Sequence, residues 1–315
     1  MGGRGAPGRS DRLGVGGPSR RPDLSMSRSH TAELAGVRVG DGLPVILMGV
    51  INVSPESFHG GSVHRDAGAV LKAAGVMVEH GAALIDVGAR STAPYLSTEV
   101  SEDEEARRLV EAIEALGDLP VPISADSCRP GPVRAALQAG ARIVNDVSGL
   151  RDPAVAALVA AHGAGLVLMA SPDPAGARAA AASPAATVAR LLAEGLERAA
   201  VAGIPAERIV VDPGIGFFRD EGVAWPEWDA RVLAELPALR ALERPIAVGV
   251  SRKSFLGAIL GRPDPAERLA GSLAATAIAV ANGAALVRTH DVGETRDAVR
   301  VAERLARPRT RGLDA

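Results

Sequence analysis

The stretch NGAALVRT at residues 282–289 carries the pattern on which the fold rests, because a glycine precedes a short apolar run. Similar stretches recur as HGAALID at 80–86, AGARIVND at 139–146 and HGAGLVLM at 162–169. Glycine commonly ends a helix in a left-handed conformation, and an unbroken apolar run is typical of a strand buried on both faces. Each stretch therefore predicts a helix end followed by a buried parallel strand.

Eight strands of this kind are expected along the chain, each followed by an Ala-rich amphipathic segment. They are predicted at residues 45–52, 83–87, 121–125, 142–145, 165–169, 208–211, 245–250 and 285–289. Strands that alternate with helices indicate βα units and a parallel sheet. Eight units favour a single closed (β/α)8 TIM barrel, an α/β fold, over an open sheet.

The composition excludes two classes of partner. The chain has 315 residues, 35 Lys+Arg against 37 Asp+Glu, and only 2% aromatic residues. Balanced charge and few aromatics give no case for a nucleic-acid partner, whose phosphates attract clustered Lys and Arg. The most apolar stretch, 273–287, is shorter than the roughly 20 residues of a membrane span. We expect neither nucleic acid nor membrane as a partner.

Both ends of the chain differ from the middle. Residues 1–40 are rich in Gly, Arg, Ser and Pro, a composition typical of a disordered tail. The barrel is expected over 41–307, followed by a frayed C-terminus at 308–315. The tail lacks the apolar run of a secretory signal, and a single cysteine, Cys128, cannot form an internal disulfide. These features predict a cytoplasmic protein.

One acidic run has a structural interpretation. Ser101 and Glu104 form a capping box, and an amphipathic segment follows them. Acidic residues are favoured in the first turn of a helix by its dipole. Residues 102–105 are therefore predicted to begin a helix rather than to bind a metal.

Polar residues end seven of the eight predicted strands. In a TIM barrel the active site lies at these carboxyl ends. A single Asp or Asn there is often only a helix N-cap, but the whole set with its basic residues favours a site. The strand-end residues are Asn52, Asp86, Asp126, Asn145, Asp146, Asp212, Ser251, Arg252, Lys253, Arg288 and His290.

Some of these residues suit a flat heterocycle. A carboxylate accepts two parallel N–H bonds, so Asp126 and Asp212 match a ring that bears adjacent N–H and amino groups. Asn145 and Lys253 add an acceptor and donors to the same pocket.

The other residues suit a charged leaving group. Arg288 and His290 are one residue apart on a strand, so they point the same way and suit a phosphate or diphosphate. Asn52 offers an oxygen to Mg²⁺, an ion usually held by few protein ligands and by the substrate's phosphates. The predicted substrate is a heterocycle with a diphosphate leaving group, and the predicted cofactor is Mg²⁺.

Five ordered motifs closely resemble the dihydropteroate synthase family. They are MGVINVSPESF at 48–58, VNDVSG at 144–149, DPGIGF at 212–217, GVSRKSFLG at 249–257 and ERLAGSLAATAIAVANGAALVRTHDV at 267–292. The resemblance runs from about residue 47 to residue 305. It implies a (β/α)8 transferase of folate biosynthesis. Such an enzyme joins 6-hydroxymethyl-7,8-dihydropterin diphosphate to p-aminobenzoate, giving 7,8-dihydropteroate and pyrophosphate.

The resemblance also implies roles for individual residues. Lys253, Arg288 and His290 would be catalytic, and Asn52 would ligate Mg²⁺. The pterin diphosphate would be bound by Thr92, Asp126, Asn145, Asp212, Lys253, Arg288 and His290. The arylamine pocket would contain Phe217, Ser254, Pro94 and Arg90. The partners would be these small molecules, and a homodimer is left open.

The second loop departs from the family pattern. It reads GARSTAPY at 88–95, so Ala93 stands where the family has an arginine, and Arg90 lies three residues earlier. This variant resembles the loop of archaeal members. We hypothesise that Arg90 supplies the missing charge to a diphosphate or carboxylate. The alternative is a surface ion pair with Glu56 or Glu99.

A second departure lies after DPGIGF, where Phe218 and Arg219 replace a common glycine and lysine. Both departures leave other functions open: a pterin transferase with a different arylamine acceptor, a non-catalytic pterin-binding paralogue, or a pterin-dependent methyltransferase. The last has no need of a diphosphate anchor, so Arg288 and His290 argue against it.

Overall fold

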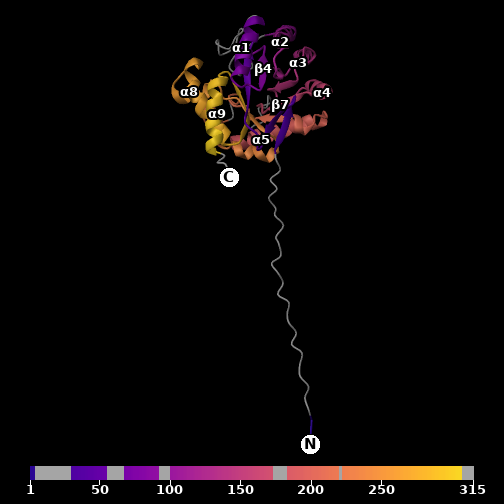
Figure 1. The fold of residues 1–315 in the computed structure, drawn as a ribbon, viewed down its shortest axis with the longest axis vertical. Coiled ribbons are helices and arrows are strands. Elements are labelled where there is room, and N and C mark those ends of the chain that lie inside the picture. The colour runs from indigo at the N-terminus through magenta and orange to yellow at the C-terminus, as the bar shows by residue number, and fades with distance from the viewer. Residues whose placement is uncertain (4–29, 55–66, 92–99, 173–182, 220–221, 307–315) are drawn as a thin grey trace, which may run out of the picture.

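The computed structural model describes residues 1–3, 30–54, 67–91, 100–172, 183–219 and 222–306. Eight parallel strands close into a barrel in chain order, with the last strand paired to the first, which confirms the predicted TIM barrel (Figure 1). The strands are β3 (Ile46–Asn52), β4 (Leu84–Gly88), β5 (Ile123–Asp126), β6 (Ile143–Asp146), β7 (Gly165–Met169), β8 (Ile209–Asp212), β9 (Ile246–Val248) and β10 (Ala284–Thr289).

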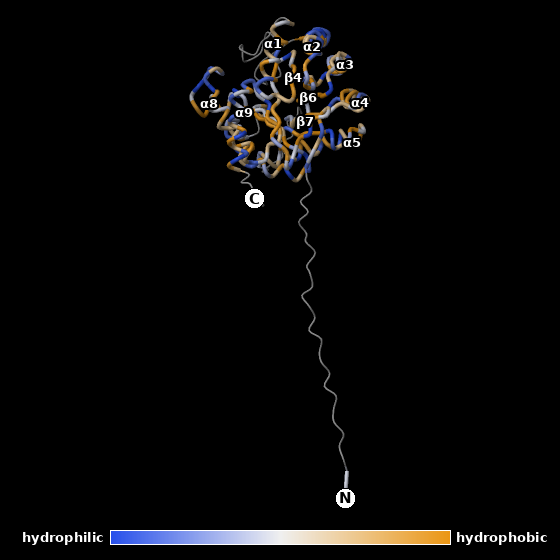
Figure 2. Tube along the Cα trace, in the orientation of Figure 1, coloured by the Kyte–Doolittle hydropathy of each residue, from blue (hydrophilic) through white to orange (hydrophobic). Residues whose placement is uncertain are grey.

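Helices surround the barrel. They are α1 (Ala67–Glu79), α2 (Glu102–Ala115), α3 (Pro130–Gln138), α4 (Pro153–His162), α5 (Pro184–Val201), α6 (Trp225–Ala234), α7 (Ser254–Leu260), α8 (Leu269–Ala281) and α9 (Val292–Ala306). Short 3₁₀ helices, η2 (Ala206–Arg208), η3 (Leu236–Leu242) and η4 (Pro265–Arg268), lie between them. Figure 2 shows the more hydrophobic chain gathered in the central strands. No helix of the described ranges is long and apolar enough to cross a membrane.

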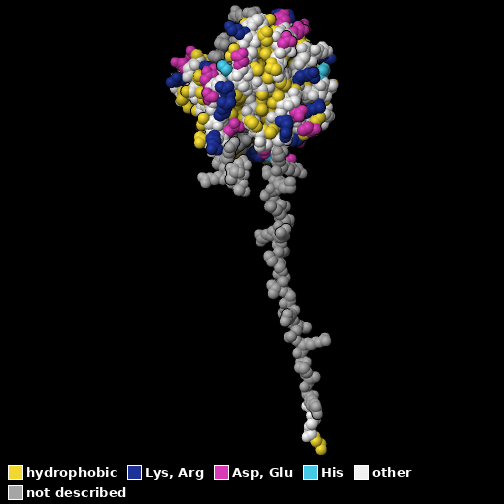
Figure 3. All heavy atoms as spheres, viewed as in Figure 1, with side chains coloured by type: hydrophobic (Ala, Val, Ile, Leu, Met, Phe, Trp, Pro, Cys, Tyr) yellow, Lys and Arg dark blue, Asp and Glu magenta, His cyan; other side chains and the backbone are white. Residues whose placement is uncertain are grey.

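Two local predictions are confirmed. The glycines of the four repeated stretches, Gly81, Gly140, Gly163 and Gly283, all have positive φ, as a helix end before a strand requires. The hydroxyl of Ser101 accepts a hydrogen bond from the backbone N–H of Glu104, so this serine is the N-cap of α2. Figure 3 shows acidic and basic side chains interspersed on the face in view, in keeping with the balanced charge.

The predicted tail is too long at its C-terminal side. Residues 31–40 form an antiparallel hairpin of β1 (Thr31–Leu34) and β2 (Val37–Gly40), so the expectation of disorder is wrong for these ten residues. The physical reason is that Leu34 and Val39 are apolar and wholly buried, and Ala35 and Gly36 adopt the positive φ of a tight turn. Residues 4–29 and 307–315 lie outside the described residues.

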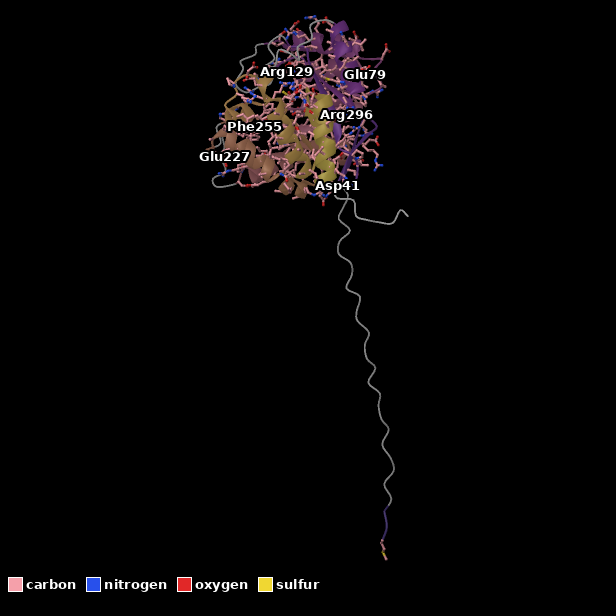
Figure 4. All side chains as sticks on the ribbon, turned by 60° about the vertical axis from the view of Figure 1, so that its left-hand side comes forward. Asp41, Glu79, Arg129, Glu227, Phe255 and Arg296 are labelled. Carbon is pink, nitrogen blue, oxygen red and sulfur yellow. The ribbon has the colours of Figure 1, made fainter. Side chains whose placement is uncertain are left out.

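The hairpin closes one end of the barrel. Leu34 packs so tightly under β7 that a Cβ atom on Gly165 would lie 2.9 Å from its Cδ2. Beside the hairpin, Asp41 accepts two hydrogen bonds from Arg240 of η3, and these bonds lower the pKa of the carboxyl. Figure 4 shows Asp41 at this lower end and Arg129 at the opposite end. The cluster joins Ala32, Leu34 and Val39 to Met48, Leu84, Ile143, Val167, Val210, Ala247, Ala285 and Leu286.

We predict that Leu34→Ala lowers the free energy of unfolding by about 2–5 kcal/mol, because it leaves a cavity between the hairpin and the barrel. Urea unfolding followed by circular dichroism measures this loss. Leu71→Ala is the matched control, since Leu71 is 42% exposed on α1 and should cost at most about 0.5 kcal/mol. Equal losses in the two variants would contradict a packing role for the hairpin.

Candidate active site

The barrel strands turn alternate residues inward, and this period of two builds the site. On β4 the inward residue Leu84 belongs to the lower apolar cluster, and Asp86 comes next above it. On β10 the same step leads from Leu286 to Arg288. The lower layer is therefore a packed apolar floor, and the layer above it is polar.

A cavity lies over this polar layer and encloses about 980 Å³ of empty space, part of it open to solvent. Ten of the twelve predicted site residues line it. They are Asn52, Arg90, Asp126, Asn145, Asp212, Phe217, Lys253, Ser254, Arg288 and His290. The other two, Thr92 and Pro94, lie outside the described residues. The structure thus brings together, in one cavity, residues spread over more than 230 positions of sequence.

Arg288 is at the centre of a buried ionic network. Its Nε donates to Oδ2 of Asp86 at 2.7 Å, and its Nη2 donates to Oδ2 of Asp126 at 2.8 Å. The Nδ2 of Asn145 donates to the same oxygen of Asp86 at 3.1 Å. The guanidinium group expected to bind an anion is therefore also bound to two carboxylates.

Asp86 was not among the predicted site residues, although it stands at a strand end. It is wholly buried and has no contact with the cavity, so its part is to hold Arg288 and Asn145. The signal that could have found it is a charged residue inside the apolar run ALIDVG, since a buried charge needs a partner.

Asp126 presents an acceptor to the cavity. Its Oδ1 is buried and has no hydrogen-bond partner among the described residues. Burial raises the pKa of Asp126 to about 7, while Arg288 opposes the rise. A ligand that donates N–H groups would restore the hydrogen bonds that burial has removed.

The DPGIGF turn surrounds Lys253. Asp212 ends β8 and accepts a hydrogen bond from the backbone N–H of Gly214 at 2.7 Å, and burial raises the pKa of this carboxyl. At Gly216, where φ is +86°, a Cβ atom would lie 2.9 Å from Cδ of Lys253. The ammonium group donates to the carbonyl of Ile215 at 2.6 Å and lies 4.7 Å from the ring centre of Phe217. Burial lowers the pKa of Lys253 to about 8.

Asp229 of α6 supports this turn from outside the cavity and was not predicted. Its Oδ1 accepts from the backbone N–H of Gly216 at 2.9 Å, and burial raises its pKa to about 6. Because it lies on a helix far from any motif, no feature of the sequence points to it.

The three consecutive polar residues of the loop after β9, Ser251, Arg252 and Lys253, make different contacts. Ser251 Oγ lies 2.9 Å from Nδ1 of His290 and fixes the position of the imidazole ring. Arg252 has a positive φ of 54° and turns away to form a bidentate ion pair with Asp291. Arg252 therefore holds the loop, whereas Lys253 lines the cavity.

Arg90 lines the cavity, but its ion-pair partner is one that the sequence did not predict. Its Nε donates to Oε2 of Glu105 at 3.2 Å. Glu56 and Glu99, the expected surface partners, lie outside the described residues. Arg90 follows β4, and the neighbouring strands β3 and β5 end in Asn52 and Asp126.

Arg219, which stands where the family commonly has a lysine, also lines the cavity. Its Nη2 donates to Oγ of Ser254 at 2.7 Å, and its guanidinium carbon lies 4.0 Å from the ring centre of Trp225. It follows β8, which is diametrically opposite β4 in the ring of eight strands. The cavity therefore has one arginine on each of two opposite sides.

Two side-chain oxygens beside Gly88 fit a Mg²⁺ ion that is held mainly by other ligands. In the described part of the chain, no group of three or more His, Cys, Asp or Glu residues could hold a metal by itself. A Cβ atom on Gly88 would lie 3.4 Å from Oδ1 of Asn52 and 3.6 Å from Oδ2 of Asp126, so two oxygens face one space. Such a pair fits an ion held mainly by its substrate and water.

Comparison with known proteins gives a consistent result. The family described as pterin binding enzyme matches residues 48–290. The dihydropteroate synthase of Synechocystis sp. is 38% identical over 266 residues, which cover 83% of this chain and 90% of the relative. The dihydropteroate synthase of Escherichia coli strain K12 is 37% identical, over 82% of this chain and 90% of the relative. A bifunctional archaeal relative from Haloferax volcanii is 39% identical over 81% of this chain and 30% of its own length. Bacterial and archaeal relatives are thus about equally similar.

Solved structures agree with the sequence relatives. Xanthomonas albilineans dihydropteroate synthase with 4-aminobenzoic acid matches with a TM-score of 0.77 and 36% identity, over 89% of this chain and 99% of that chain. The same enzyme in complex with 7,8-dihydropteroate matches with a TM-score of 0.74, over 88% of this chain and 99% of that chain.

We predict that Lys253 titrates near pH 8 rather than at its usual value of 10.5, because burial disfavours the ammonium form. Lys72 and Lys253 are the two lysines of the chain, so ¹³C reductive methylation and NMR can follow both. Asp212→Asn should lower the midpoint further, since the negative charge of Asp212 raises the pKa of this lysine. Lys72 is exposed and serves as the internal reference. Equal midpoints for the two lysines would contradict the buried position of Lys253.

Proposed function

The chain belongs to the pterin-binding enzymes, and from this premise we propose how its residues carry out the transfer. It is a transferase of folate synthesis that joins 6-hydroxymethyl-7,8-dihydropterin diphosphate to p-aminobenzoate. The observation that supports the residue roles best is that ten predicted site residues line one cavity above an apolar floor.

The pterin ring is held by the carboxylates of the cavity. Asp126 accepts ring N–H groups through Oδ1, the buried oxygen without a partner among the described residues. Asp212 accepts on the opposite side, and Asn145 and Lys253 donate to the ring's acceptors. Since burial raises the pKa of both carboxyls, bound N–H donors stabilise their ionised forms.

The diphosphate is held on the side of β3 and β10. Arg288 supplies positive charge there and His290 supplies a hydrogen bond, and Asn52 with Asp126 offers the oxygens that would hold Mg²⁺. When bound, Mg²⁺ neutralises charge on the phosphate oxygens. Arg288 keeps its bonds to Asp86 and Asp126, so the diphosphate anchor and the pterin carboxylate are one connected unit.

The reaction exchanges one bond for another. The bond from the pterin methylene carbon to oxygen breaks, and pyrophosphate leaves with the electron pair. The electron-rich pterin stabilises positive charge on the carbon that is left. The amine nitrogen of p-aminobenzoate then forms the new C–N bond and releases one proton to solvent. Arg288 and His290 stabilise the charge that develops on the leaving group, which is the largest catalytic contribution expected here.

The arylamine is bound between Phe217 and Ser254. Thr92 and Pro94, the other residues predicted for this pocket, lie outside the described residues. Its carboxylate is bound by Arg219, because this arginine is held beside Ser254 by a hydrogen bond. Arg90 was expected on this side as well. Its position next to Asn52 and Asp126 instead favours the diphosphate as the anion that it faces.

We also propose a cytoplasmic location and a homodimer. The single cysteine, Cys128, supports a reducing compartment. Ile259 of α7 and Ile278 of α8 are more than half exposed, and apolar side chains of this size favour an interface between copies.

The experiment that tests the function measures pyrophosphate release from the pterin diphosphate with and without p-aminobenzoate. Release that requires the arylamine and stops on chelation of Mg²⁺ supports the proposal, with 7,8-dihydropteroate identified by mass spectrometry. Pyrophosphate release that gives no 7,8-dihydropteroate when p-aminobenzoate is present, or turnover with another arylamine only, would contradict it.

We predict that Arg219→Ala raises the KM for p-aminobenzoate roughly ten- to hundredfold, because a hydrogen bond to a charged group contributes about 1.5–3 kcal/mol. Steady-state kinetics with 4-aminobenzamide, an acceptor without the carboxylate, should show a much smaller change. Arg231→Ala is the matched control, since Arg231 pairs with Glu227 on the surface of α6. A similar rise in KM for both acceptors would remove Arg219 from carboxylate recognition.

A further inference from the structure

Glu105 is a buried carboxylate that the proposed mechanism does not use. It lies in the first turn of α2, and its side chain is only 1% exposed. Three donors from two segments, the loop after β4 and the loop after β5, reach it: Arg90 Nε at 3.2 Å, Ser127 Oγ at 2.6 Å and Arg129 Nη1 at 3.2 Å. A simple helix start, as predicted for residues 102–105, does not require these contacts.

The charges around Glu105 do not balance. One carboxylate faces two guanidinium groups, so Glu105 alone cannot neutralise both. Arg90 lines the cavity, and its Nη1 has no hydrogen-bond acceptor among the described residues. Both Arg90 and Glu105 act electrostatically on Asp126, another residue of the cavity wall. Arg90 therefore keeps one donor group for a ligand in the cavity.

Glu105 also connects two distant points of the chain. Arg129 Nη1, which donates to Glu105, donates to the backbone carbonyl of Val100 at 2.7 Å as well. Arg90 and Val100 are the described residues near the two ends of the segment 92–99. One carboxylate thus fixes the guanidinium at the cavity wall and the backbone beyond that segment.

Stability alone does not explain this arrangement. A buried ion pair gives little net stability, because desolvation offsets the attraction between the charges. The ion pair between Arg107 and Glu111, on the exposed side of the same helix, avoids this desolvation cost because both side chains stay in water.

We propose that Glu105 is a positioning residue that holds Arg90 at the cavity wall, where the arginine binds the diphosphate of the substrate. This role rests on the proposed function. Glu105 itself does not touch the substrate, since it does not line the cavity. A guanidinium fixed in advance loses less side-chain entropy when it binds an anion than a mobile one does.

The test compares two ligands in the presence of Mg²⁺: the pterin diphosphate and 6-hydroxymethyl-7,8-dihydropterin, which lacks the diphosphate. Calorimetry gives the ratio of the two affinities. Glu105→Gln keeps the size of the side chain and removes its charge, so the ratio should fall about tenfold. Glu111→Gln, on the exposed side of α2, should leave the ratio as in the wild type.

A double variant shows whether Glu105 acts through Arg90. If it does, Glu105→Gln should change the ratio less than about twofold once Arg90→Ala is present, because coupled residues are not additive. An unchanged ratio in Glu105→Gln, or independent effects in the double variant, would overturn the inference.

A second single variant keeps the test open if Glu105→Gln does not fold, as judged by its melting temperature. Arg90→Lys keeps the positive charge but loses the Nε donor that pairs with Glu105, so the ratio should again fall several-fold. A wild-type ratio in Arg90→Lys would overturn the inference. If the wild type itself does not bind the pterin diphosphate more tightly than the free pterin, the proposed function fails. If the wild type does so but the variants keep its ratio, only the positioning role of Glu105 fails.

Discussion

The ion pairs of Arg288 with Asp86 and Asp126 are the interaction on which the rest of the site depends. They join three strands across the interior of the barrel, at the layer where the apolar floor ends. Removing the arginine would leave two carboxylates buried without a counter-charge, which is far more costly than the net gain from the pair. The same group therefore stabilises the polar interior, and under the proposed function it would also provide the positive charge that meets the leaving group.

Burial also shifts the pKa values of two other ionisable groups of the cavity. It raises the pKa of Asp126 to about 7 and lowers the pKa of Lys253 to about 8. Each group is thereby closer to its neutral form, and Oδ1 of Asp126 is left without a hydrogen-bond partner among the described residues. The glycines of the DPGIGF turn permit this burial, because a Cβ atom at Gly216 would collide with the lysine.

The limits of sequence-based prediction follow from the range of the interactions. The strands, the helix caps and the strand-end residues depend on local periodicity, so they could be read from the chain. The partners of Asp86, Asp229 and Glu105 could not be read in this way, because each lies at least 13 residues away along the chain. The hairpin at 31–40 was missed for a similar reason: its few apolar residues become a core only when the barrel covers them.

The sequence by itself determined the (β/α)8 architecture and the set of polar strand ends, since a regular βα alternation suffices for these, and five ordered motifs identified the family by resemblance. The tertiary structure alone decided which charges meet. It turned Arg252 outward to Asp291 and Lys253 inward. It also placed Arg90 and Arg219 on opposite sides of one cavity. The physical reason is that electrostatic pairing depends on distance in space and on burial, and neither can be read from separation along the chain.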